Sequence, residues 1–190
     1  MPPRKKPKAP VGLAHLDERG AARMVDIGSK PTTHRVAVAE AWVKVSASSL
    51  ERLNAGSSHK GDTLAVVRLA GIQAAKRTSD LIPLAHPLLL THVAVDITVE
   101  PEVHRVRIEA RAETLNLTGV ELEAMVAAST AALTLYDMLK SHDRGMVIER
   151  VQLIMKSGGR SGTYRRAERK GETEVSTIPR TKKKKRKRRV

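Results

Sequence analysis

The chain has 190 residues, enough for one ordinary domain, and its 35 Lys and Arg against 20 Asp and Glu give a formal net charge of +15. It has no cysteine, which excludes disulfides, cysteine-ligated zinc or iron–sulfur sites and a thiol nucleophile. With no Phe, one Trp and two Tyr, a nucleic-acid platform that stacks bases on aromatic rings is disfavoured.

Almost all of the positive charge lies at the two ends of the chain. Residues 1–13 hold four basic and no acidic residues, and residues 165–190 hold thirteen basic and three acidic residues. Both ends are predicted to be disordered basic tails, which leaves residues 14–164 as one domain with a net charge of +1. The C-terminal run of basic residues favours two interpretations about equally. One is a solvated tail, and the other is a tail that makes a weak, nonspecific contact with RNA or another anionic surface.

The apolar residues are spread through the domain instead of being gathered in one run. No apolar segment of signal-peptide length follows the basic start, and no stretch approaches the roughly 20 apolar residues of a membrane span. We therefore expect a cytoplasmic protein with no membrane span. Because aromatic residues are so scarce, its core is expected to consist of Val, Leu, Ile, Ala and Met.

The first half of the domain is predicted to form a strand followed by two helices. Alternating apolar residues predict a half-buried strand over residues 35–45, and a short helix is expected over residues 48–54. Asp62 is a good N-cap for a second helix, whose apolar residues recur at helical spacing and which should end near Ser79. The prolines of residues 81–87 exclude helix and predict an apolar loop that carries one histidine.

The second half is predicted to contain a hairpin, a long helix and a last strand. Residues 90–112 alternate between apolar and charged and turn at 101–103, as in an antiparallel hairpin with one wet face. Residues 118–121 fit a capping box that opens a helix ending near residues 142–145, and a strand follows over residues 146–155. This order of elements predicts an α+β fold, a ferredoxin-like sandwich (split βαβ) in which an antiparallel sheet carries its helices on one face.

Two polar residues stand out in the loops of the first half. Lys60 lies just before the N-terminus of the predicted second helix, where free N–H groups and the helix dipole favour a phosphate. The alternative is an ordinary exposed lysine. His86 lies between prolines, whose rigid apolar surroundings would fix its direction and shift its proton affinity. The alternative is a histidine with a purely structural role.

The predicted long helix carries four charged residues: Glu121, Glu123, Asp137 and Lys140. Glu123 and Asp137 lie within about 40° of one another around the helix but about 21 Å apart along it. Both can therefore act only at opposite ends of a large ligand or in sites shared between subunits. The alternative for Asp137 and Lys140 is an ordinary i, i+3 ion pair on a solvated face.

A glycine-rich segment, residues 156–162, follows the last predicted strand. Its backbone N–H groups together with Lys156 and Arg160 could cradle phosphates. The segment matches neither the dinucleotide fingerprint nor the Walker pattern. No spacing of His and carboxylates indicates a zinc site, and no nucleophile-elbow sequence supports a Ser-His-Asp triad.

At these segments the chain resembles the cyclic pyranopterin monophosphate synthase family, the accessory protein C of molybdenum cofactor biosynthesis. The matching stretches run in family order over about residues 24–164: 24–26 (MVD), 60–62 (KGD), 70–78 (AGIQAAKRT), 80–84 (DLIPL), 86–88 (HPL), 119–124 (GVELEA), 136–138 (YDM) and 156–159 (KSGG).

The resemblance implies a lyase that converts (8S)-3',8-cyclo-7,8-dihydroguanosine 5'-triphosphate to cyclic pyranopterin monophosphate with release of pyrophosphate. It implies no required cofactor, with Mg²⁺ accompanying the triphosphate or pyrophosphate as an option. It also implies a homohexamer, a trimer of dimers with its sites at the dimer interface. The resemblance assigns catalysis to Asp137, Lys140 and Lys60, and substrate binding to Leu84, Ala85, His86, Leu122, Glu123, Glu121, Lys156, Arg35 and Asp26.

The sequence departs from the family pattern at two places. Ala85 stands where the family usually has Cys before the His-Pro pair, and little effect is expected because the backbone can still bind. Residues 114–118 lack the Gly and basic residue that usually precede the Thr-Gly pair, which removes one expected cation. The alternative function is therefore a catalytically weakened member that acts as a scaffold or as an anion- or RNA-binding protein through its basic tails.

Overall fold

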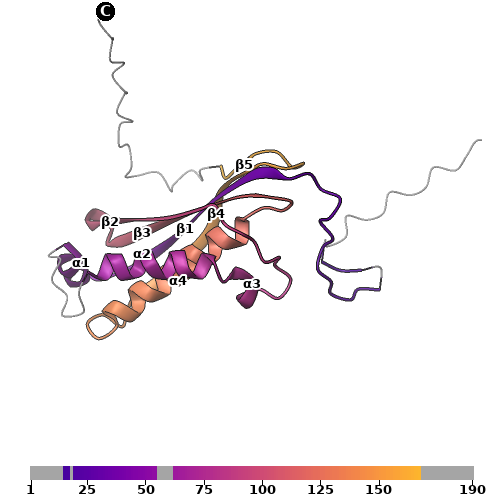
Figure 1. The fold of residues 1–190 in the computed structure, drawn as a ribbon. Helices are drawn as coiled ribbons and strands as arrows, with labels where there is room; N and C mark the ends of the chain where they lie inside the picture. The colour runs from indigo at the N-terminus through magenta and orange to yellow at the C-terminus, as the bar shows by residue number, and fades with distance from the viewer. Residues whose placement is uncertain (1–14, 18, 55–61, 168–190) are drawn as a thin grey trace, which may run out of the picture.

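The computed structural model describes residues 15–17, 19–54 and 62–167 (Figure 1). The predicted tail over residues 1–13 lies outside the described residues, and so does the C-terminal tail beyond residue 167. The elements in chain order are β1 (Thr33–Lys44), α1 (Ala47–Asn54), α2 (Thr63–Ala75), α3 (Thr78–Leu81), β2 (His92–Glu100), a single 3-10 turn (Pro101–Val103), β3 (Arg105–Asn116), α4 (Glu121–Leu139), β4 (Val147–Ser157) and β5 (Tyr164–Arg165).

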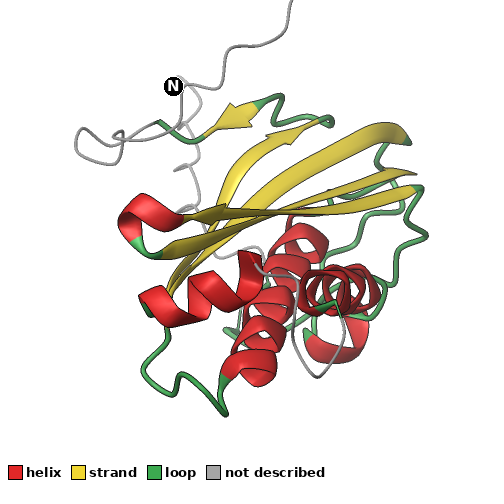
Figure 2. Ribbon diagram, turned by 90° about the vertical axis from the view of Figure 1, so that its left-hand side faces the viewer, coloured by secondary structure: helices red, strands yellow, loops and turns green. Residues whose placement is uncertain are grey.

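The strands form one antiparallel sheet in the order β2-β3-β1-β4-β5. Strand β3 lies between β1 and β2 and runs antiparallel to both, which is the split βαβ arrangement. Figure 2 shows the helices gathered on one face of the sheet and the other face uncovered by helices. The predicted α+β, ferredoxin-like sandwich is confirmed.

Small side chains bring the long helix close to the sheet. Ala37, Ala39 and Ala41 of β1 are fully buried, as are the alanines at one face of α4. Helix α2 also crosses α4 closely, because a Cβ added at Gly71 would lie 3.0 Å from the carbonyl oxygen of Ala127. A core of alanine and β-branched residues therefore replaces the aromatic core that the composition excludes.

Helix α4 has the length and hydropathy of a membrane span, with 19 residues and a mean hydropathy of 1.2 over its most apolar window. Eight of its residues are buried against the rest of the fold, among them the carboxyl-bearing Glu123. This is the pattern of a core helix, which can be as long and as apolar as a membrane span.

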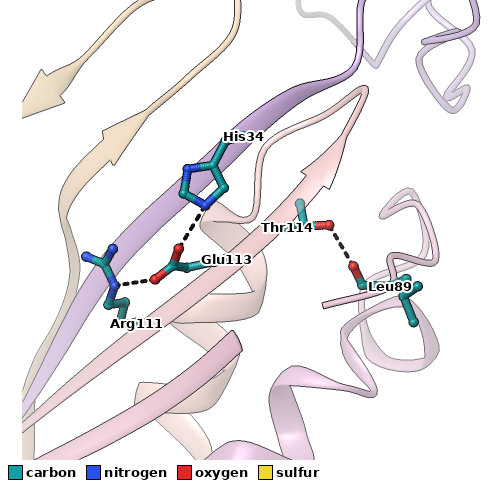
Figure 3. A network of polar contacts seen from close by, with 5 residues as sticks. All are labelled: His34, Leu89, Arg111, Glu113 and Thr114. Carbon is teal, nitrogen blue, oxygen red and sulfur yellow. Dashed lines mark hydrogen bonds and ion pairs between the residues drawn. The ribbon is translucent and has the colours of Figure 1, made fainter. Parts of the chain in front are cut away.

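The uncovered face of the sheet is a layer of ion pairs. The carboxylate of Glu113 accepts from His34 Nε2 at 2.8 Å and from Arg111 Nε at 2.8 Å (Figure 3). The hydrogen bond from Arg111 lowers the pKa of Glu113 against the opposing effect of burial, and His34 lowers the pKa further. The alternating charges of β3 thus find partners on β1, on β4 and within β3 itself.

The structure corrects the predicted boundaries of two helices. Asp62 caps α2 as predicted, accepting from the N–H of Ala65 at 3.0 Å, but α2 ends at Ala75 instead of continuing to Ser79. The chain turns there and restarts as α3, and the hydroxyl of Thr78 donates to the carbonyl of Ala75 at 3.1 Å. Helix α4 ends at Leu139, before the expected region around residues 142–145.

The last strand also continues further than predicted. Strand β4 extends to Ser157, and a short strand, β5, returns along its edge. Arg166 adds two contacts to β4, with its N–H on the carbonyl of Ile154 at 2.8 Å and its Nε on the carbonyl of Leu153 at 2.9 Å. Residues hydrogen-bonded to the sheet therefore extend through Arg166, two positions beyond residue 164, where the sequence predicts the domain to end.

Candidate functional site

Two adjoining cavities lie where β1 and β4 approach the N-terminus of α4. The first, here called the glycine-rich hollow, has a volume of about 590 Å³ and lies between β1, residues 117–119 and residues 156–161. The second, the histidine hollow, has a volume of about 420 Å³ and lies between the loop of residues 84–88 and the first turn of α4. Both cavities share four residues: Lys30, Thr118, Gly119 and Glu121.

Glu121 joins α4 to β4 instead of capping the helix. Its Oε1 lies 2.8 Å from Lys156 Nζ. The N-cap of α4 is Val120, with no hydrogen bond from a side chain, so the predicted capping box at residues 118–121 is wrong. The physical reason is that the ammonium of Lys156 offers the carboxylate a charged partner, which is stronger than a neutral backbone N–H.

The glycine-rich loop turns sharply after β4. Gly158 and Gly159 have φ angles of +97° and +74°, in the left-handed region that favours glycine. A Cβ at Gly159 would overlap Nη1 of Arg35, and a Cβ at Gly158 would overlap the carbonyl oxygen of His34. The two glycines therefore let the loop lie directly against the beginning of β1.

Arg35 is buried and holds the turn that leads into α4. Its Nη2 donates to the carbonyl of Leu117 at 3.0 Å, and its Nε lies 3.4 Å from the carbonyl of Asn116. These contacts show what the departure at residues 114–118 does in this chain. Leu117 lines the hollow, its main-chain carbonyl accepts from Arg35, and its apolar side chain supplies no cation.

The glycine-rich hollow carries an excess of positive charge. Among the described residues, four cationic side chains line it, Lys30, Arg35, Lys156 and Arg160, against the single carboxylate of Glu121. Such an imbalance favours a ligand with several negative charges, and arginine and lysine are the side chains that bind phosphate oxygens best. The hollow is suited to a polyphosphate.

The loop that builds the histidine hollow is held from two sides. His86 Nε2 lies 2.9 Å from the carbonyl of Val25, so Nε2 carries a proton and Nδ1 is the nitrogen left for another partner. The hydroxyl of Thr114 donates to the carbonyl of Leu89 at 2.6 Å and ties the loop to β3 (Figure 3). Leu84 and Ala85 line the same hollow, as expected.

Glu123 is a buried carboxyl at the edge of the histidine hollow, beside Leu122. Only 4% of it is exposed. Burial raises the pKa of Glu123 to about 7, and the nearby charge of Glu121 acts in the same direction, against a hydrogen bond to the backbone N–H of Glu123. A carboxyl with this pKa can hold or release a proton at neutral pH.

Asp137 and Lys140 lie far from both hollows, at the C-terminal end of α4. Lys140 Nζ is 2.6 Å from Asp137 Oδ1, and both side chains are more than half exposed. The hydrogen bond and the charge of Asp137 raise the pKa of Lys140. Neither residue lines either hollow. Within one chain, therefore, the two ends of α4 do not form a common site.

Two other expected residues have different outcomes. Lys60 lies outside the described residues. Asp26 lines neither hollow, and its Oδ1 instead accepts from the N–H of Gly28 at 2.8 Å. The described residues hold no group of three or more His, Asp and Glu side chains suited to a metal ion.

The sequence reasoning missed the part of the site that comes from the N-terminal segment. His15, Val25 and Ile27 line the histidine hollow, and Lys30 lines both hollows. These residues precede the first strand and show neither helical nor strand periodicity. Of the eight matching stretches only residues 24–26 fall in this segment, so the one signal that could have directed attention to Lys30 was that nearby match.

Comparisons with known proteins agree on one family. A model of the MoaC family matches residues 24–159. A protein of Thermomicrobium roseum named cyclic pyranopterin monophosphate synthase is 59% identical over 154 residues, which cover 81% of this chain and 93% of the relative. Relatives of the same name from a Roseiflexus species and from Cereibacter sphaeroides are 57% and 52% identical, and each alignment covers 80% of this chain and 96% of the relative.

Proposed function

Because the chain belongs to the MoaC family, we propose that it is a lyase of molybdenum cofactor biosynthesis, a cyclic pyranopterin monophosphate synthase. Its substrate is (8S)-3',8-cyclo-7,8-dihydroguanosine 5'-triphosphate, and its products are cyclic pyranopterin monophosphate and pyrophosphate. The observation that carries this proposal is the pairing of a cation-lined hollow with an adjoining hollow that holds His86 and Glu123. Relatives 52–59% identical carry the synthase name.

The two hollows suit the two parts of this substrate. The glycine-rich hollow takes the triphosphate, where Lys156 and Arg160 neutralise the charge of the departing pyrophosphate. The histidine hollow takes the guanine-derived ring system against Leu84, Ala85 and Leu122. A bound substrate then extends from one hollow into the other, past the residues that line both.

The reaction needs proton transfers at a fixed position. A hydroxyl of the substrate attacks the α-phosphorus, the bond from that phosphorus to pyrophosphate breaks, and the proton of the hydroxyl must pass to a base. Rearrangement of the purine-derived ring requires further proton transfers. Glu123, whose pKa is about 7, can exchange a proton at neutral pH, and Nδ1 of His86 is left to accept a hydrogen bond from the substrate, because Nε2 already donates to Val25.

Asp137 and Lys140 enter the proposal through a second copy of the chain. We assign them the acid–base roles that the family resemblance implies, together with Lys60. The assembly proposed is the homohexamer, a trimer of dimers, that the resemblance implies. The position of both residues outside the hollows of their own chain supports a shared site, in which the C-terminal end of α4 in one subunit completes the site of its neighbour. Arg35 and Glu121 then hold the walls of the hollow in place.

The chemistry as proposed requires no redox cofactor, and Mg²⁺ enters only as a companion of the phosphates. The proposed location is the cytoplasm. The alternative of a scaffold or RNA-binding protein gains no support from the relatives, which carry an enzyme name.

The test is a turnover assay with the full chain and purified cyclised substrate, with release of pyrophosphate and formation of the product both measured. Stoichiometric release of the two products supports the proposal. A pure, folded protein that shows no turnover but binds RNA in a salt-sensitive manner would establish the alternative.

A further inference from the structure

Lys30 is placed where the two hollows meet. Its side chain is half-buried and lines both the glycine-rich hollow and the histidine hollow. Within the part of the chain that the structure describes, its ammonium has no hydrogen bond or ion pair, whereas Lys156 is paired with Glu121 and Arg35 donates to two carbonyls. Lys30 is therefore a cation whose donors are free for a ligand.

A tight turn sets the position of Lys30. Asp26 Oδ1 accepts from the N–H of Gly28 at 2.8 Å, and the N–H of Lys30 donates to the carbonyl of Ile27 at 3.0 Å. Such a turn, in which an aspartate accepts from a main-chain N–H two residues later, fixes the local backbone. Pro31 follows and lines the glycine-rich hollow. Asp26 itself lines neither hollow, and the turn is the structural link between it and Lys30.

We propose that Lys30 is a further substrate-binding residue that holds the phosphate group at the wall between the two hollows, and that Asp26 is the positioning residue that directs Lys30 there. This inference rests on the proposed function. In the substrate the α-phosphate lies between pyrophosphate and the ring system, so it occupies the shared wall when the two ends fill the two hollows. An ammonium at that wall neutralises the α-phosphate oxygens and holds the phosphorus in reach of the attacking hydroxyl.

The direct test compares Lys30→Met with Lys30→Arg in the full chain. Lys44→Met serves as the matched control, because Lys44 is an exposed lysine at the end of β1 and lines neither hollow. The probe is inorganic tripolyphosphate, titrated by calorimetry. Loss of a hydrogen bond to a charged group should weaken its binding roughly tenfold to hundredfold in Lys30→Met. Lys30→Arg should recover most of the affinity, and Lys44→Met should bind within about twofold of the wild type.

The role of Asp26 has its own readout. Asp26→Ala should raise KM for the cyclised substrate with a smaller effect on kcat, whereas Asp26→Asn, which keeps an acceptor oxygen, should restore KM. If Asp26 acts through Lys30, the double variant Asp26→Ala with Lys30→Met binds tripolyphosphate no more weakly than Lys30→Met alone. Additive losses would show that Asp26 acts elsewhere and would overturn this part of the inference.

The two proposals fail in different ways. A wild-type protein that turns over the substrate while Lys30→Met binds tripolyphosphate normally disproves the role of Lys30 and leaves the proposed function standing. A wild-type protein that binds tripolyphosphate through Lys30 but releases no pyrophosphate disproves the proposed function and leaves a polyphosphate-binding lysine. Equal loss of binding in Lys30→Met and Lys44→Met would show a nonspecific charge effect and overturn the inference.

Discussion

Lys156 Nζ lies 2.8 Å from Glu121 Oε1, and this contact joins the end of β4 to the first turn of α4. The pair closes one side of the glycine-rich hollow, and both side chains are about 30% exposed there. The lysine favours an anionic ligand and the carboxylate opposes it. The two residues should therefore respond to mutation in opposite directions.

Lys156→Met should weaken binding of inorganic tripolyphosphate about tenfold, and Glu121→Gln should strengthen it severalfold, because the first change removes a cation and the second removes a carboxylate from the lining of the hollow. Calorimetric titration at low ionic strength measures both. If both variants lost affinity equally, the pair would be a purely structural bridge with no electrostatic role in binding.

Gly159→Ala should destabilise the fold more than Gly162→Ala. Both glycines have positive φ angles, +74° and +64°, so each alanine should cost about 1 kcal/mol for the left-handed conformation. At Gly162 nothing lies within 4 Å of an added Cβ, whereas at Gly159 the Cβ would overlap Arg35. Urea unfolding gives the free energy of unfolding of each variant. The difference between the two variants measures the steric cost of the overlap with Arg35.

Gly159→Ala should also lose turnover that Gly162→Ala retains, because displacing Arg35 releases the turn at Asn116 and Leu117. The assay is pyrophosphate release under saturating substrate. Equal behaviour of the two variants would mean that the loop does not depend on its contact with Arg35.

Glu123 should make the fold less stable as the pH rises. Its pKa is about 7 in the folded chain against a usual 4.5, so between these values the folded state holds a proton that the unfolded state has lost. Stability is unaffected by this group below about pH 4.5, falls as the pH rises to about 7, and then remains lower by about 3 kcal/mol.

Glu123→Gln imitates the protonated carboxyl, so it should be more stable than the wild type at pH 8 by about 3 kcal/mol and similar to it at pH 4.5. Glu102→Gln, at an exposed carboxylate, is the control and should follow the wild type at both pH values. Urea unfolding at the two pH values gives the comparison. A parallel pH dependence in Glu123→Gln and the wild type would contradict the raised pKa.

Asp137→Asn and Lys140→Ala should abolish pyrophosphate release and leave the urea midpoint unchanged. The two side chains form an exposed ion pair that contributes little to folding, while the proposed reaction needs their proton chemistry. Circular dichroism and unfolding curves provide the fold control. Full activity in either variant would remove that residue from the proposed mechanism.

Mixing two impaired variants, at a substrate concentration where each alone has little activity, tests whether the sites are composite. Lys156→Met damages the glycine-rich hollow, and Asp137→Asn damages the far end of α4. If a site combines one end from each of two subunits in a symmetric dimer, an equimolar mixture after subunit exchange should recover about a quarter of the wild-type activity. The separate variants, incubated alone in the same way, are the controls. Recovery no greater than the sum of the two would place each complete site within one subunit.

Deleting residues 168–190 should leave turnover and stability unchanged and remove salt-sensitive retention on an anionic matrix, since this segment carries most of the C-terminal excess of Lys and Arg. Deleting residues 164–190 should destabilise the protein, because β5 and Arg166 contact β4. Urea unfolding and elution in a salt gradient measure the two effects. Salt-sensitive retention that survived both deletions would assign the anion binding to the domain or to the basic residues 1–13.

The local pattern of the sequence determined the secondary structure and, through its order, the fold. Alternation along residues 93–112 predicts the hairpin, and Asp62 caps α2 as expected, because periodicity and capping depend on near neighbours. The boundaries at Ala75 and Val120 differ because their outcome depends on contacts that local rules do not contain. The carboxylate of Glu121 had two potential partners. Local rules point to the nearby backbone N–H groups, whereas the fold brings Lys156 to the carboxylate from a distant part of the sequence.

The sequence by itself therefore determined the α+β order of elements, the separation of charge into the ends of the chain, and the motifs of the family to which it belongs. Only the tertiary structure decided which of these residues meet. It brings Lys30, Arg35, Glu121 and Lys156 together from four separate segments, and it leaves Asp137 at the far end of α4. The physical reason is that a cavity is formed by long-range packing of the sheet against the helices, which no spacing along the chain specifies.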